Sequence, residues 1–129
     1  MRLDDVFSTV EDCDRGAELE LLHPVTNVPT GLKMTLAGPD SETQRRARLT
    51  MLDRIGELAM ADGRVSAEHR EAESIAMLAR CVLRWDIAQD GQPLPLTHDN
   101  AVRLLSVSWV REQADAFAGT RANFIKGAA

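Results

Sequence analysis

The spacing of apolar residues changes part-way along this chain, and that change limits the fold more than any other feature of the sequence. Between residues 17 and 37 apolar and polar residues alternate, so that Leu19 and Leu21 share one face and Glu18 and Glu20 the other. From residue 41 onward, apolar residues recur every three or four positions. Alternation is typical of a half-buried strand, and the longer period is typical of an amphipathic helix. The sequence therefore predicts a mainly α fold, with three to four helices and a small N-terminal antiparallel β-hairpin.

The predicted hairpin covers residues 17–37 and has a proline-bounded turn between its two strands. Pro24 and Pro29 bound that turn because neither residue can donate a backbone hydrogen bond. A two-stranded ribbon is only marginally stable alone in water. The face that carries Leu32 and Met34 must therefore rest on the helices or join the sheet of a neighbouring chain, and both residues are candidates for partner binding.

The helices of the second part begin at residues that are typical of helix caps. Ser41, followed three residues later by Gln44, has the pattern of a capping box and opens a helix that runs to about Met60. Ser66 opens a second helix that is expected to extend through Leu83 and to pair antiparallel with the first. Two shorter helices follow further along the chain. The apolar residues expected to form the core are Leu49, Leu52, Ile55, Ile75, Leu78, Val82, Leu104, Leu105 and Phe117.

Length and composition favour one globular domain. A chain of 129 residues, of which 44% are hydrophobic and 27% charged, is long enough to bury a core. We assign residues 17–129 to a single domain, with the hairpin at 17–37 and the helices at 41–126. Residues 1–16 are an acidic segment that is either a solvated, flexible terminus or a docking segment for a basic partner.

Charge and hydropathy exclude two classes of partner. The net charge is −5, and basic residues do not gather with aromatic ones, so the phosphate contacts that dominate nucleic-acid binding are not expected. The longest apolar run falls far below the roughly 18 residues of a membrane-spanning helix. The start of the chain has no apolar stretch of a secretory signal. We therefore expect a soluble chain without nucleic-acid or membrane partners.

The residues that carry most enzyme chemistry are scattered along the sequence. His23, His69 and His98 have no second histidine or cysteine at the spacing of a metal site. Cys13 and Cys81 are far apart and are expected to be reduced. The glycine-rich and nucleophile motifs of common enzyme families are absent from the sequence. The sequence predicts no catalytic, cofactor-binding or metal-binding residues, and hence no enzymatic activity.

Two further groups of residues are candidates for partner binding. Arg45, Arg46 and Arg48 crowd the first turns of a helix, where the helix dipole is already positive, and form either a solvated face or a docking patch. Trp85 and Trp109 make up the tryptophan content of the chain. Tryptophan dominates both cores and interface hot spots, so either role is open for these two residues.

The segment that follows the second helix resembles a known protein family. It contains a tryptophan, an Asp-Gly turn, a proline-broken apolar stretch ending in threonine, a leucine-rich short helix and a last helix. The matching residues are Arg84-Trp85-Asp86-Ile87, Asp90-Gly91-Gln92-Pro93-Leu94-Pro95-Leu96-Thr97, Asn100-Ala101-Val102-Arg103-Leu104-Leu105 and Trp109-Val110-Arg111-Glu112-Gln113. The turn Pro24-Val25-Thr26 and the step Gly38-Pro39-Asp40-Ser41 are also similar to phage tail-module proteins. Together these pieces resemble the tail assembly chaperones of long-tailed bacteriophages over about two thirds of the chain.

This resemblance implies a non-enzymatic protein that acts in the cytoplasm of a bacterial host carrying a phage or prophage. Such a chaperone transiently binds the tape-measure and tail-tube proteins during tail morphogenesis and is absent from the finished virion. Self-association is left open, and the family fixes no particular binding residues. Two other classes remain: a structural virion protein of the neck, tail-completion or tube-associated type, and an enzyme or small regulator.

Overall fold

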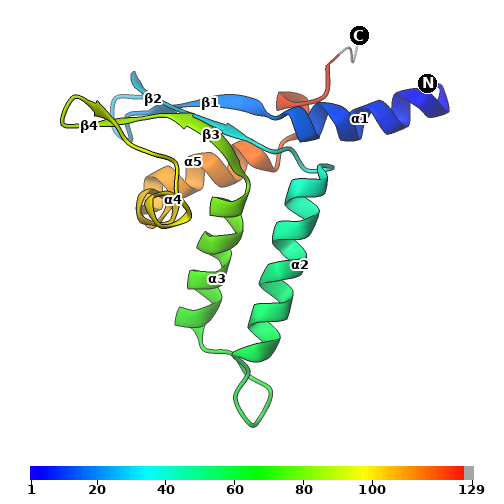
Figure 1. Ribbon diagram of the computed structural model, residues 1–129, viewed down its shortest axis with the longest axis vertical. Helices are drawn as coiled ribbons and strands as arrows, with labels where there is room; N and C mark the ends of the chain where they lie inside the picture. Colours follow the sequence, from blue (N-terminus) through cyan, green and yellow to red (C-terminus); the bar gives the residue numbers. More distant parts are fainter. Residues whose placement is uncertain (127–129) are drawn as a thin grey trace.

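The chain folds around a three-stranded antiparallel sheet that has helices beneath it and beside it (Figure 1). The computed structural model describes residues 1–126, so the last three residues of the predicted 17–129 domain lie outside it. The sheet has the order β1-β2-β3, and a second, two-stranded ribbon joins β4 to β5. The strands are β1 (Ala17–Leu22), β2 (Pro29–Leu36), β3 (Val82–Asp86), β4 (Ala88–Gln89) and β5 (Gln92–Pro93).

Helices account for most of the remaining described chain. They are α1 (Leu3–Arg15), α2 (Glu42–Glu57), α3 (Ala67–Arg80), α4 (His98–Leu105), α5 (Ser108–Ala118) and the 3-10 turn η1 (Arg121–Asn123). The prediction of a mainly α fold with three to four helices and a small N-terminal hairpin was wrong. Residues 1–126 form an α+β fold with five α-helices, in which the predicted hairpin is two thirds of a larger sheet.

The third strand is the element that the apolar spacing misassigned. The predicted second helix was extended through Leu83, whereas α3 ends at Arg80 and β3 begins at Val82. β3 runs antiparallel to β2, with Trp85 opposite Met34. β2 lies about fifty residues earlier in the sequence, so its pairing with β3 depends on tertiary contact. The local spacing of apolar residues does not predict such a pairing.

The core lies between one face of the sheet and helices α3, α4 and α5. Met34 stands opposite Leu19 on β1 and opposite Trp85 on β3, so these three side chains form a row on the face that is turned toward the helices. The buried cluster consists of Leu21, Met34, Leu36, Ile75, Leu78, Ala79, Val82, Ala101, Leu105, Val110, Ala114 and Ala118. Four of the predicted core residues (Ile75, Leu78, Val82 and Leu105) belong to this cluster, and Leu104 and Phe117 pack against it.

Helices α2 and α3 form an antiparallel hairpin that projects away from the sheet (Figure 1). Arg54 of α2 donates from Nε to Glu73 Oε1 of α3 at 2.9 Å, which joins the two helices across their contact. Because of this projection, the prediction that the apolar residues of α2 belong to the core was wrong. Leu49 and Leu52 of α2 are exposed, and Ile55 is half-buried, because the hairpin extends beyond the layer that could cover their face.

Residues 3–15 of the acidic N-terminal segment form the 13-residue helix α1. The N–H of Arg2 donates to Asp5 Oδ2 at 2.7 Å, and acidic residues in the first turn with Arg15 in the last complement the helix dipole. Gly16 ends the helix at a φ of +80°, and a Cβ there would lie 2.7 Å from the carbonyl oxygen of Leu36. Only glycine fits this step from α1 into β1.

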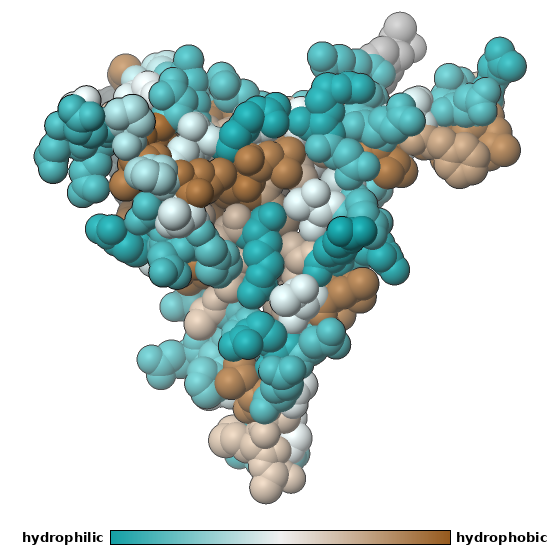
Figure 2. Space-filling view, in the orientation of Figure 1, coloured by the Kyte–Doolittle hydropathy of each residue, from teal (hydrophilic) through white to brown (hydrophobic). Residues whose placement is uncertain are grey.

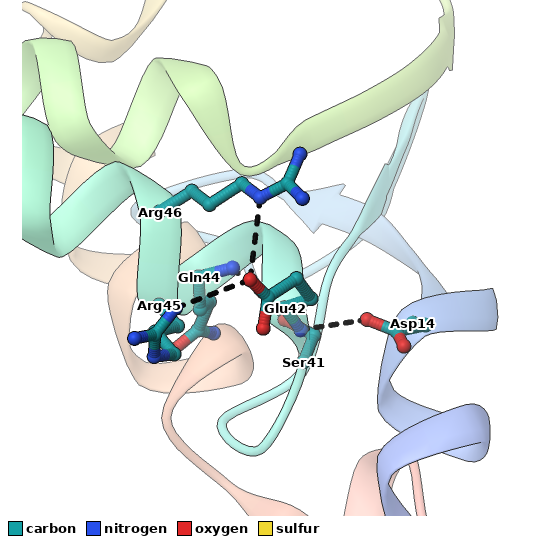
Figure 3. A network of polar contacts seen from close by, with 6 residues as sticks. All are labelled: Asp14, Ser41, Glu42, Gln44, Arg45 and Arg46. Carbon is teal, nitrogen blue, oxygen red and sulfur yellow. Dashed lines mark hydrogen bonds and ion pairs between the residues drawn. The ribbon is translucent and has the colours of Figure 1, made fainter.

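The last turn of α1 is fixed to the body of the protein. The carbonyl of Cys13 accepts from the N–H of Gly38 at 2.9 Å, and Asp14 Oδ1 accepts from the N–H of Glu42 at 2.7 Å (Figure 3). A Cβ at Gly38 would lie 2.7 Å from Phe124 Cγ and 2.8 Å from Cys13 Sγ. The end of α1 therefore packs closely against the turn that opens α2, while its first turns extend past the body (Figure 1).

The predicted capping residues of α2 do more than cap that helix. Ser41 Oγ accepts from the N–H of Gln44 at 3.0 Å, as expected for an N-cap. The amide of Gln44 does not return to Ser41 as a capping box requires; its Nε2 donates to the carbonyls of Ala37 and Ala118, both at 2.8 Å. Gln44 thus joins the end of β2 to the end of α5.

Candidate functional site

Four of the predicted partner-binding residues face inward. Met34 is 1% exposed and lies in the core, and Leu32, Trp85 and Trp109 are half-buried against it. Trp85 also donates from Nε1 to the carbonyl of Leu94 at 2.8 Å, which fixes the proline-rich crossing segment to β3. Of the two roles open for Trp85 and Trp109, the structure places both in packing contacts.

The three predicted arginines lie on the surface at the start of α2. Arg45 and Arg46 both contact Glu42 Oε1 at 3.2 Å, and Figure 3 shows the two guanidinium groups on either side of that carboxylate. Arg48 is exposed one turn further along the helix. Exposed pairs of this kind contribute little to stability, so the arginines remain available to a partner of opposite charge.

An apolar stripe on α1 was missed as a candidate surface. Leu3, Val6, Phe7 and Val10 are 68%, 46%, 61% and 38% exposed, respectively. Their spacing of three, one and three residues places them on one face of the helix. Figure 2 shows the brown side chains along the lower edge of this projecting helix. The spacing is visible in the sequence, and a helical reading of residues 3–15 would have found it.

A smaller apolar surface lies on the α2–α3 hairpin. Leu49 and Leu52 are 43% and 53% exposed, and Met60 at the tip of the hairpin is 51% exposed. Leu49 lies four residues after Arg45, and Leu52 lies four residues after Arg48, so each leucine neighbours an arginine on the helix surface. This surface combines apolar and basic groups, whereas the surface of α1 combines apolar and acidic ones.

A groove of about 430 Å³ lies where α2, α3 and α5 meet. Its wall includes Met51, Met77 and Leu78, and its rim includes Arg111 and Asp115. Arg111 is already engaged, because its Nη1 donates to the carbonyl of Leu105 at 2.9 Å. Flexible methionine side chains suit a groove that accepts an apolar group of varied shape.

Burial lowers the reactivity of both cysteine thiols, one of which, Cys81, lines the groove. Burial raises the pKa of the Cys81 thiol to about 11, so the sulfur is protonated near neutral pH and is a weak nucleophile. Burial also raises the pKa of the Cys13 thiol above its ordinary value. Both thiols are free and buried. His23 has a local role, since its Nδ1 accepts from the N–H groups of Val25 and Thr26 at 3.2 and 3.3 Å.

Among residues 1–126, no group of three or more His, Cys, Asp or Glu side chains is arranged to hold a metal ion. None of the helices in the same residues combines the length and the apolar character needed to cross a membrane.

No family model matches the chain, and neither a curated protein nor a solved structure matches it.

Proposed function

We propose that this chain is a tail assembly chaperone of a long-tailed phage or prophage, acting without catalysis in the cytoplasm of the bacterial host. It transiently binds tape-measure and tail-tube proteins while the tail is built. The observation that carries the proposal is the uncovered apolar stripe of α1, which gives the chain a surface for binding another protein.

The geometry of α1 supports transient binding. A 13-residue helix is near the lower limit of stability on its own, and the hydrogen bonds that join α1 to other elements within residues 1–126 come from its last turn, at Cys13 and Asp14. The four exposed side chains present roughly 400 Å² of apolar surface, if their exposed fractions are applied to side chains of about 150–200 Å² each. A stable interface buries about 800 Å² on each partner, so this face fits a complex that forms and separates.

The two longest segments that resemble the chaperone family, residues 84–97 and 100–113, follow each other closely along the chain. Residues 84–97 include the last three residues of β3 and the crossing ribbon, and residues 100–113 include most of α4 and the first half of α5. The Nε1–H of Trp85 and the amide of Gln113 bind backbone groups: Trp85 holds Leu94, and Gln113 donates to and accepts from Leu22 at 2.8 and 2.9 Å. Trp85 and Gln113 therefore hold elements of the fold together. We expect the residues that bind a partner to be at more exposed positions.

A pull-down of the tagged chain from bacteria that carry the source phage tests the proposal. Mass spectrometry of the eluate should identify the tape-measure or tail-tube protein. An eluate that contains neither protein, from cells that express both, contradicts the proposal.

The arginines of α2 give a second, separable prediction for the same assay. Arg45→Glu with Arg46→Glu should weaken the capture of tail proteins, because it replaces a basic patch with acidic groups beside Glu42. Far-UV circular dichroism should not change, since both side chains are exposed. Unaltered capture would remove this patch from the binding surface and leave α1 as the candidate.

A further inference from the structure

The apolar stripe of α1 has a distinctly charged border on one side. Asp4 lies three residues before Phe7 and Glu11 lies four residues after it, so both carboxylates neighbour the same aromatic ring on the helix surface. On the opposite border, Arg2 lies four residues before Val6 and Thr9 lies three residues after it. The stripe is therefore an apolar face with one acidic edge.

Other acids of α1 are engaged and do not define the partner. Asp5 accepts from the N–H of Arg2, Asp12 pairs with Arg15 at 3.1 Å, and Asp14 accepts from the N–H of Glu42. Asp4 and Glu11 are thus the acids of α1 that border the stripe and make no hydrogen bond or ion pair to another described side chain.

We propose that α1 binds an amphipathic helix of a partner protein, one that has apolar residues at positions i, i+3, i+4 and i+7 and a row of lysine or arginine along one edge. Leu3, Val6, Phe7 and Val10 contact the apolar residues of that helix, and Asp4 and Glu11 contact its basic edge. This inference rests on the proposed function, because it specifies the chemistry by which the chaperone recognises a tail protein.

Charge also disfavours a second copy of α1, packed antiparallel, as the occupant. An antiparallel pair of identical helices brings the same edge of each helix together, so Asp4 and Glu11 of one copy would face Glu11 and Asp4 of the other. Repulsion between the facing carboxylates opposes this pairing. A basic helix replaces this repulsion with attraction.

Two synthetic helical peptides test the chemistry directly. Both carry leucine at i, i+3, i+4 and i+7; one has lysine along a single edge, and the other has glutamate at the same positions. Fluorescence anisotropy with the full chain should show that the lysine peptide binds at least about tenfold more tightly than the glutamate peptide, and that added salt narrows the difference.

Matched variants separate this face from general attraction to an acidic protein. Phe7→Ser should weaken binding of the lysine peptide about tenfold or more, whereas Leu49→Ser with Leu52→Ser, on the exposed face of α2, should leave it unchanged. Asp4→Lys with Glu11→Lys should reverse the preference in favour of the glutamate peptide. Far-UV circular dichroism of each variant should show the same total helix content as the wild type.

Several results overturn the inference. Equal binding of the two peptides would show that the acidic edge does not contribute to recognition. Undiminished binding by the Phe7→Ser variant would show that the apolar stripe does not contribute. Sedimentation of the chain alone as an oligomer that Phe7→Ser dissociates would show that a second copy covers the face. If neither peptide binds but the tagged chain still captures tail proteins, the inference fails while the proposed function stands; if the peptides behave as expected but no tail protein is captured, the proposed function fails instead.

Discussion

A methyl group added at Gly38 should loosen α1 from the body of the protein. The Cβ of Gly38→Ala would lie 2.7 Å from Phe124 Cγ and 2.8 Å from Cys13 Sγ, whereas carbon atoms in contact are about 3.5–4.0 Å apart. Both neighbours are buried and have little room to move. Overpacking of this kind costs about 1–3 kcal/mol.

Urea denaturation provides the measurement. A loss of about 2 kcal/mol, with a slope of about 2 kcal/mol per molar urea, lowers the unfolding midpoint by about 1 M. Hydrogen exchange should also be faster along α1. The added methyl group displaces Cys13, which weakens the hydrogen bond from the N–H of Gly38 to the carbonyl of Cys13.

Gly56→Ala is the matched control, since Gly56 lies within α2 and a Cβ there meets no atom within 4 Å. This change should leave the protein as stable or raise its free energy of unfolding by up to about 1 kcal/mol. A Gly38→Ala protein as stable as the Gly56→Ala protein would refute the close packing of α1, Gly38 and Phe124.

Three other changes test separate contacts. Ser41→Ala removes the side-chain cap of α2 and should lower the free energy of unfolding by about 1 kcal/mol in thermal denaturation; an unchanged midpoint would show that Ser41 does not cap the helix. The raised pKa of the Cys81 thiol, about 11 against an ordinary 9.0, means that the folded chain keeps a proton that the unfolded chain releases. The free energy of unfolding should therefore fall by about 2 kcal/mol as the pH rises from 9 to 11, and Cys81→Ala should flatten this part of the pH profile. Arg121 holds the pKa of the Asp40 carboxyl below its ordinary value, so their pair stabilises the fold at neutral pH and loses that contribution as the pH falls through the folded pKa. Asp40→Asn should be less stable than the wild type at pH 7 and should approach it as the pH falls through the folded pKa of Asp40; a difference that does not shrink in acid would contradict this.

The helix starts, which depend on neighbouring residues, were predicted, and the third strand, which depends on a distant contact, was not. Helix starts depend on neighbouring residues, and Ser41, Ser66 and Thr97 each accept from the N–H three residues later, as their patterns indicate. Strand β3 depends on contact with β2, and Val82 continues the apolar spacing of Ile75 and Leu78. The same local pattern therefore led to a helix that was too long and a sheet that was too small.

The candidate surface shows a related limit. Apolar spacing identifies the face of a helix, but the tertiary arrangement decides whether another element covers it. Leu49 and Leu52 have the spacing of core residues and remain exposed because the α2–α3 hairpin projects beyond the sheet. Conversely, Met34 has the alternation of a two-sided ribbon and is buried because α5 and the neighbouring helices cover its face.

The composition of the finished virion tests the central proposal most directly. Cells carrying the phage with this gene deleted should recover normal tails when the tagged chain is supplied from a plasmid. Mass spectrometry of the purified virions should then detect the tape-measure and tube proteins but not the tagged chain. Normal tails that retain the chain in a fixed ratio to the other tail proteins would contradict the chaperone proposal and identify a structural component.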